Sequence, residues 1–239
     1  MTGLDGMRLG HATGVNLAAG AVGALANLLI AALVGRHLGV VGAGYYFLVV
    51  AVFMIAANTI ELGADTGLVR FVSAAHARGR PEEITVLLRS AVRPVLVAAG
   101  LLVAVTAIVV LATDPLVSVP PWLLIVTSAV AGCLAMVAVL LGVPRGYGDT
   151  LVYPALQNLL LPLGRLAAIG VAVAAGWGLS GVLAAWLVPV PLVLVVAAAV
   201  TVRLVRASPS SATIDSNGRR ELGATFWKFS TARGFAACV

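Results

Sequence analysis

Charged side chains are scarce in this 239-residue sequence, and they make up only 10% of it. Soluble globular proteins usually carry about 25% charged residues. Hydrophobic residues, in contrast, make up 61% of the chain. There is too little charge to cover an ordinary water-facing surface, so the composition excludes a soluble globular domain.

Cysteine and histidine are also rare. The two cysteines, Cys133 and Cys238, lie in apolar segments, where they do not form a disulfide framework of the kind found in secreted domains. The three histidines, His11, His37 and His76, fall in three different gaps between apolar segments. This spacing does not predict a metal site, and we expect neither a metal nor another cofactor.

Long apolar stretches fill most of the remaining sequence. Each of six stretches holds about the 20 apolar residues that are needed to cross the hydrocarbon core of a bilayer. They show no polar alternation, which favours helices over the strands of a membrane barrel. We therefore predict an all-α polytopic membrane protein, with one six-helix transmembrane lobe plus the start of a seventh helix. The stretches are 14–35, 44–63, 94–113, 121–143, 154–175 and 179–202.

The composition changes once, near residue 205. Residues 1–204 form the predicted N-terminal six-helix transmembrane lobe. Residues 205–224 are rich in Ser, Pro, Asn, Gly and charge, which is typical of a linker. Residues 225–239 are apolar again and resemble the truncated start of a second lobe.

The arginines fall mainly in every second gap between the apolar stretches. Cytoplasmic loops of membrane proteins carry an excess of Lys and Arg, so this distribution predicts a cytoplasmic N-terminus and a cytoplasmic linker. The net charge of +6 is spread over these gaps, and we expect no nucleic-acid partner. The predicted location is the bacterial plasma (inner) membrane. The arginines concerned are Arg8, Arg70, Arg78, Arg80, Arg89, Arg93, Arg145, Arg203, Arg206, Arg219 and Arg220.

Two stripes of polar or small residues lie within the apolar stretches. In the first stretch, Asn16 and Asn27 share one helical face with small residues at three- and four-residue spacing. At the end of the second stretch, Glu61 and Asp65 form another stripe. Such stripes are explained either by close helix packing with interhelical hydrogen bonds or by a shared water-filled cavity.

Arg165 lies well inside the fifth stretch, after the helix-bending Pro162. An arginine at the centre of a membrane helix costs about 2.5–3.5 kcal/mol on insertion scales. Three interpretations remain open. Arg165 pairs with Glu61 or Asp65, it faces a substrate, or it reaches toward the membrane surface.

Two short motifs resemble a known family of transporters. The turn after the first stretch reads RHLG over 36–39 and AGYY over 43–46, and further on the sequence reads ELG over 61–63 and LVR over 68–70. Their spacing resembles the signatures of the polysaccharide-exporting flippases, which belong to the superfamily that includes the lipid II flippase and the multidrug and toxin extrusion antiporters. The resemblance covers residues 16–95 well. One departure is Ala43, where the family usually has an aromatic residue.

The resemblance implies a transporter of two six-helix lobes that works by alternating access on a lipid-linked oligosaccharide or polysaccharide precursor. The chain would then be an N-terminal fragment, or a half-size protein that dimerises. The implied partners are the lipid-linked glycan, membrane lipid, and either the missing C-terminal lobe of the same protein or a homodimer partner. On this interpretation Arg36 and Arg165 contact the diphosphate, and Asn16 and Asn27 contact sugar. Glu61 and Asp65 are counter-ions or proton carriers.

Other functions remain as alternatives. A cation- or proton-coupled multidrug antiporter of the same superfamily would use the same lobes with an acidic pocket. A membrane scaffold without transport activity is the third candidate. A membrane glycosyltransferase or polymerase would group catalytic side chains in a sizeable outer loop. The predicted outer gaps here are short and nearly free of charge, so we do not expect an enzyme.

Overall fold

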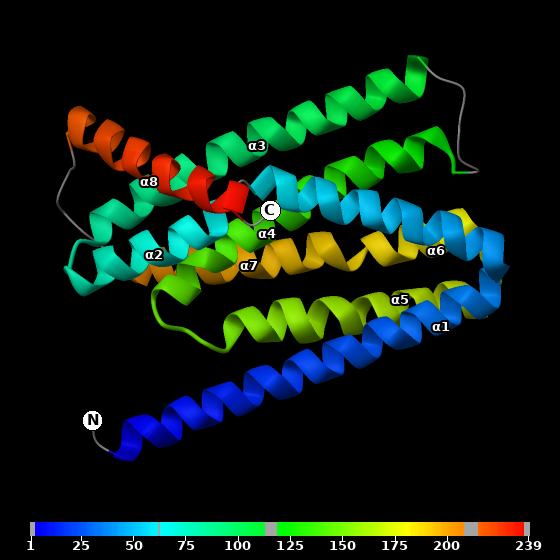
Figure 1. Ribbon diagram of the computed structural model, residues 1–239, viewed down its shortest axis with the longest axis horizontal. Helices are drawn as coiled ribbons and strands as arrows, with labels where there is room; N and C mark the ends of the chain where they lie inside the picture. The colour runs from blue at the N-terminus through cyan, green and yellow to red at the C-terminus, as the bar shows by residue number, and fades with distance from the viewer. Residues whose placement is uncertain (1–2, 62, 113–118, 208–214, 237–239) are drawn as a thin grey trace.

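A computed structural model of the chain describes residues 3–61, 63–112, 119–207 and 215–236. The regular structure within these ranges is entirely helical (Figure 1). The elements are α1 (Gly3–Glu61), α2 (Ala64–Ala77), α3 (Pro81–Ala112), α4 (Pro121–Gly146), the π-helix η1 (Pro154–Leu160), α5 (Leu161–Ala174), α6 (Leu179–Leu187), α7 (Pro189–Ala207) and α8 (Ser216–Ala236).

Five helical segments in the described part of the chain are long and apolar enough to cross a membrane. The first of them, Gly14–Ala77, holds two of the predicted stretches, and the other four hold one stretch each. All six predicted stretches are therefore helical. The prediction of an all-α polytopic membrane protein is confirmed.

α1 is a helical hairpin with its turn at Gly39. The backbone of Gly39 has φ 68° and ψ −177°, a conformation that is accessible to glycine and strained for residues with a side chain. Figure 1 shows α1 running from the N-terminus to one end of the bundle and then returning. His37 Nε2 donates a hydrogen bond to the Trp177 carbonyl oxygen at 2.8 Å and ties the hairpin to the α5–α6 turn. We call this end of the bundle the hairpin end.

α4 is the central helix of the bundle. In the most apolar 18-residue stretch of α4, 67% of the residues are buried, whereas in that of α3 only 6% are buried. α4 therefore faces protein, and α3 mostly faces outward. One side of α4 contributes Leu123, Val137 and Leu141 to a core with α1, α5, α6 and α7. Its other side contributes Val139 and Val143 to a second core with α2, α3 and α8.

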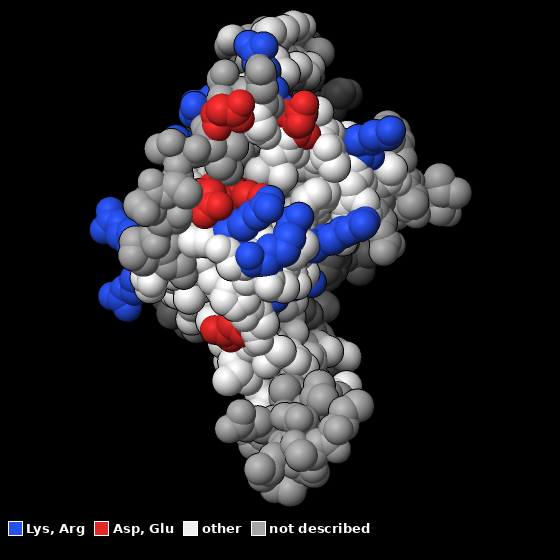
Figure 2. Space-filling view, turned by 90° about the vertical axis from the view of Figure 1, so that its left-hand side faces the viewer, with Lys and Arg blue, Asp and Glu red and all other residues white. Residues whose placement is uncertain are grey.

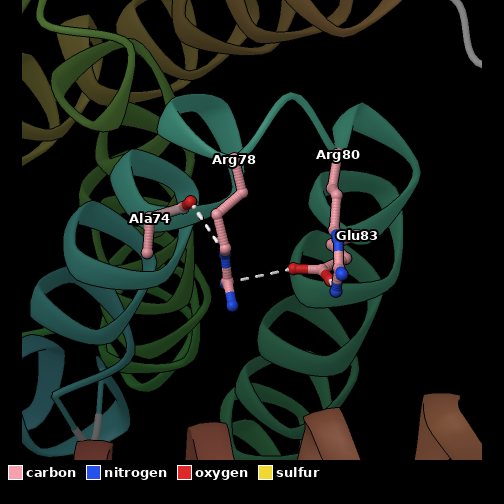
Figure 3. Close-up of polar contacts among 4 residues, drawn as sticks. All are labelled: Ala74, Arg78, Arg80 and Glu83. Atoms are coloured by element: carbon pink, nitrogen blue, oxygen red, sulfur yellow. Dashed lines mark hydrogen bonds and ion pairs between the residues drawn. The ribbon is translucent and has the colours of Figure 1, made fainter.

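The turn between α2 and α3 is held by two ion pairs (Figure 3). The Glu83 carboxylate accepts one hydrogen bond from Arg78 Nη2 at 3.3 Å and another from Arg80 Nη1 at 3.1 Å. Arg78 Nε also donates to the Ala74 carbonyl oxygen, so this guanidinium caps the end of α2. Exposed pairs of this kind contribute at most about 1 kcal/mol each. They join the end of α2 to the first turn of α3 across the turn.

α3 continues from this turn through Pro94 without interruption. Ile84, Leu87 and Ala91 are buried against the bundle, and this confirms the helical periodicity of this segment. The exposed Arg89 and Arg93 lie on the opposite side of the helix.

α8 packs against α2 and α3. Phe226 is completely buried, and its ring meets Phe71 of α2 edge to face at 5.8 Å. Trp227 Nε1 donates to the Ser90 carbonyl oxygen of α3 at 3.0 Å. Arg70 lies over the Phe229 ring at 4.3 Å. These contacts make α8 part of the same bundle as α2 and α3.

This arrangement differs from the domain boundaries expected from composition. α7 continues to Ala207, and α8 begins at Ser216, inside the predicted linker 205–224. The predicted start of a second lobe, 225–239, forms the rest of α8 as far as Ala236, and residues 237–239 lie outside the described part of the chain. Composition did not reveal this helix because its polar first turns resemble a loop.

Charged residues gather at the end of the bundle opposite the hairpin end. Figure 2 shows this face, with many basic side chains and several acidic ones among them. The described arginines here belong to α2, the α2–α3 turn, the first half of α3, the last turns of α4 and α7, and the start of α8. We call this face the charged end. It is defined by Arg70, Arg78, Arg80, Arg89, Arg93, Arg145, Arg203, Arg206, Arg219 and Arg220.

Candidate functional site

Arg165 is placed deep in the bundle by η1 and α5. Pro162 has no N–H to donate to the Asn158 carbonyl in a regular α turn, and the chain forms a π-helix over Pro154–Leu160 just before it. Arg165 follows Pro154 by eleven residues and therefore lies about midway along the apolar segment Pro154–Ala174.

The guanidinium of Arg165 stacks on Trp186 of α6. The distance from its Cζ to the ring centroid is 3.8 Å, and only 7% of the residue is exposed. Trp186 in turn meets Phe53 of α1 edge to face at 4.8 Å. A desolvated cation–π contact contributes about 2 kcal/mol, so the stacking offsets part of the cost of burying Arg165. The stacking does not supply hydrogen-bond acceptors for the guanidinium N–H groups.

Those N–H groups are incompletely satisfied. No group within the described ranges accepts a hydrogen bond from Nε or Nη2 of Arg165. The Tyr46 phenol is also buried without a hydrogen-bond partner in the same ranges. A buried donor without an acceptor costs about 1–3 kcal/mol, and more when it is charged. The site is therefore suited to an anion that approaches the guanidinium.

A second polar site lies toward the charged end. A cavity of about 330 Å³ is lined by Asn16 of α1, Val69 of α2, Arg145 of α4, and Asp149, Thr150, Tyr153 and Pro154. Arg145 Nη1 lies 3.9 Å from Asp65 Oδ2, and its Cζ lies 4.5 Å from the Tyr153 ring centroid. We call this cavity the inner pocket.

Asp149 has a structural role in the inner pocket. Its Oδ1 accepts hydrogen bonds from the backbone N–H groups of Leu151 at 2.9 Å and Val152 at 3.1 Å. The carboxylate thus orders the loop before η1. Arg145 is the basic side chain in the pocket wall, and it is only partly neutralised because the contact with Asp65 is long.

The structure brings some of the predicted site residues together and separates others. Asn16 lines the same cavity as Arg145, which pairs with Asp65, and Glu61 lies one turn before Asp65 at the end of α1. Arg36 is exposed at the hairpin end, far along the bundle from this group. Asn27 is exposed on the first arm of α1. The six residues do not form a single site.

The described part of the chain does not show the ion pair that one interpretation of Arg165 predicted. No salt bridge in the described ranges joins Arg165 to Glu61 or Asp65, because Asp65 pairs with Arg145 near the charged end. In this conformation Arg165 stacks on Trp186 and is 7% exposed, so its side chain is directed into the bundle and not toward the membrane surface. A role in facing substrate stays a prediction, since the guanidinium is covered in this conformation.

Sequence reasoning missed three residues of these sites. Arg145 was read only as a topology signal, and Tyr46 only as part of a turn motif. Trp186 carried no signal, since a tryptophan in an apolar stretch is most often a packing residue. One local clue to the Arg165–Trp186 contact is that the two residues lie on either side of the short α5–α6 turn. Helices joined by short turns are antiparallel neighbours, so residues on them can meet.

In comparisons with known proteins, no family model, no curated protein and no solved structure matches this chain. The class that the fold defines is a helical polytopic membrane protein with a buried arginine near the middle of the bundle.

Proposed function

We propose that the protein is a transporter that flips or exports a lipid-linked oligosaccharide or polysaccharide precursor across the bacterial plasma membrane. The observation that carries the proposal is Arg165, a buried cation near mid-membrane whose Nε and Nη2 have no acceptor in the described part of the chain. Ionisable residues inside membranes commonly mark substrate pathways. An arginine fork suits the diphosphate of a lipid-linked glycan. The motifs over 36–70, which resemble those of the polysaccharide flippases, support the same function.

The inner pocket is proposed as the place where the substrate headgroup first binds. Arg145 supplies positive charge, and Asn16 and Thr150 supply groups that can hydrogen-bond sugar or phosphate. Figure 1 shows the two arms of α1 meeting at the hairpin end and diverging toward the charged end, where this pocket lies. A headgroup bound there would then move along the bundle toward Arg165, with Tyr46 and Trp186 displaced from the guanidinium.

Exposed amides within the membrane-spanning segments support a transport surface. Asn27 and Asn58 are both exposed on α1, one on each arm. A polar side chain facing lipid is costly, whereas one facing water or another protein is not. On our proposal these two residues face the substrate cavity, which a second lobe or a second copy of the chain closes.

The function is tested in cells of the bacterium that makes the protein. Deletion of the gene should abolish the surface glycan and leave its lipid-linked precursor in the inner leaflet, and expression of the gene should restore export. Precursor sidedness is measured in intact cells with an impermeant lectin. Unchanged surface glycan together with increased sensitivity to cationic drugs would instead support the antiporter, and no change in either would support the scaffold.

The proposed orientation places the charged end in the cytoplasm, in line with the positive-inside rule. In a cysteine-free background, cysteine at Ser73 of α2 should resist an impermeant thiol reagent in intact cells. Cysteine at Gly178, in the turn before α6, should react. Both positions are exposed, so the difference reports sidedness rather than burial. Reaction at Ser73 in intact cells, with protection at Gly178, would reverse the orientation.

A further inference from the structure

An apolar groove runs along the outside of the bundle near the hairpin end. It has a volume of about 360 Å³ and lies between the second arm of α1, the end of α3 and the start of α4. Its walls include Leu48, Val52 and Phe53 of α1, Leu102 and Thr106 of α3, and Ser128 of α4. We call it the lateral groove. The proposed transport sites do not use it.

The lateral groove offers little to a polar ligand, because its lining has only three hydroxyl groups, those of Thr106, Thr127 and Ser128. Thr127 Oγ1 donates to the Leu123 carbonyl oxygen at 2.7 Å, and Ser128 Oγ donates to the Ile125 carbonyl oxygen at 2.8 Å. These two hydroxyls are therefore satisfied within α4, and no charged residue lines the groove. An apolar cavity of this kind does not hold ordered water. Its occupant is expected to be hydrocarbon.

Position and surroundings also indicate a lipid environment. The groove residues of α4 lie within eleven residues of Pro121, so they span the half of the hydrocarbon core nearer the hairpin end. Val52 and Val105 line the groove and are 58% and 55% exposed, so its rim is apolar and open. α3 has only 6% of its apolar window buried, so this side of the bundle faces the bilayer.

The volume of the lateral groove suits a hydrocarbon chain. At about 360 Å³ it falls within the range of about 300–1,000 Å³ that is usual for pockets that hold small ligands. One extended acyl chain can therefore lie in it, and a transmembrane helix packed over the groove is the alternative that the labelling experiment tests.

We propose that the lateral groove is a binding site for one acyl chain of a bilayer phospholipid. The absence of charge in its lining means that the headgroup is not recognised, which favours the abundant phospholipids over a lipid selected for its headgroup. Phe53 forms part of the groove wall and packs against Trp186, which covers Arg165. The acyl chain therefore supports the wall that keeps the guanidinium covered. The proposal does not depend on the transport function.

Photolabelling tests the site directly. The purified chain is placed in vesicles of phosphatidylethanolamine and phosphatidylglycerol that contain a phosphatidylethanolamine with a mid-chain diazirine, and adducts are mapped by mass spectrometry. We expect adducts to concentrate on Val52, Thr106 and Ser128 relative to Leu101, which is 62% exposed on α3 outside the groove. Equal labelling of Thr106 and Leu101 would overturn the proposal, because it would mean ordinary contact with bulk lipid.

A matched pair of variants fills the groove or leaves it open. Ala56→Phe places a ring in the groove, whereas Ala51→Phe places the same ring on an exposed part of the same arm that does not line it. We expect Ala56→Phe to lower groove adducts about tenfold, equivalent to about 1.4 kcal/mol, and Ala51→Phe to leave them unchanged. If Ala56→Phe does not fold, Thr106→Phe with Ala104→Phe as its control gives the same comparison from α3.

Two other results would also overturn the proposal. One is unchanged labelling in a folded, groove-filled variant. The other is labelling of the groove by a diazirine-bearing prenyl lipid but not by the acyl probe, which would identify a prenyl chain as the occupant. Adduct formation on the groove residues would support the site even if the deletion experiment showed no role in glycan export.

Discussion

Replacing Arg165 with leucine is expected to abolish glycan export while the protein remains abundant in the membrane. Loss of one partner from a buried charged hydrogen-bonded pair costs about 2–5 kcal/mol, which corresponds to a loss of about thirtyfold to a few thousandfold. Abundance should be retained because Arg165 has no ion-pair partner in the described chain that would be left stranded. Surface glycan and membrane abundance are measured in the same cells.

Two further variants separate charge from geometry. Arg165→Lys retains the positive charge but loses the planar fork and the stacking on Trp186, so we expect partial export. Arg93→Leu removes an exposed arginine from the charged end and serves as the control, with export near normal. Full export by Arg165→Leu would remove this residue from the mechanism. A fall in abundance that is reversed by neutralising Asp65 would show that the two residues do pair.

The second large effect is expected at Gly23, where α1 meets η1. A Cβ atom at this position would overlap the carbonyl oxygen of Asn158, and this neighbour is backbone that cannot rotate away. Gly23→Ala must therefore push α1 away from η1. Overpacking of this kind typically costs about 1–3 kcal/mol. A lower thermal unfolding midpoint in detergent, by about 2–4 °C per kcal/mol, is the expected measurement.

Gly20 provides the matched control for Gly23. It lies three residues earlier on the same arm, and a Cβ atom there would meet nothing within 4 Å. Gly20→Ala should be neutral or slightly stabilising, because alanine favours a helix by up to about 1 kcal/mol over glycine. Equal midpoints for the two variants would mean that α1 and η1 are not in close contact.

Much of this fold could be predicted from hydrophobicity, since the membrane requires long apolar helices. The apolar stretches and the gaps rich in arginine were located from sequence alone, and the helices follow them closely. The turn after the first stretch was expected at RHLG over 36–39, and the chain reverses at Gly39. Val40 and Val41 continue as helix directly after it, so the break occupies one residue rather than the longer gap that separates the two predicted stretches.

The sites were less predictable because they depend on contacts between distant segments. Asp65 meets Arg145 across 80 residues of sequence, and Trp227 reaches Ser90 across 137. Periodicity places a residue on a face of its own helix but does not name the helix opposite. For this reason Arg165 could be recognised as unusual from its depth, while its aromatic neighbours and its lack of an acidic partner could not.

The π-helix before α5 also bears on how Arg165 can be uncovered. A π turn holds about one residue more than an α turn, so conversion of η1 to α geometry would shift the register of α5 by one residue. That shift turns the following helix by about 100° and moves it by about 1.5 Å. Arg165 comes five residues after the end of η1, so its guanidinium would swing away from Trp186 while α5 itself stays intact. Such a conversion would change the direction of Arg165 through η1 alone.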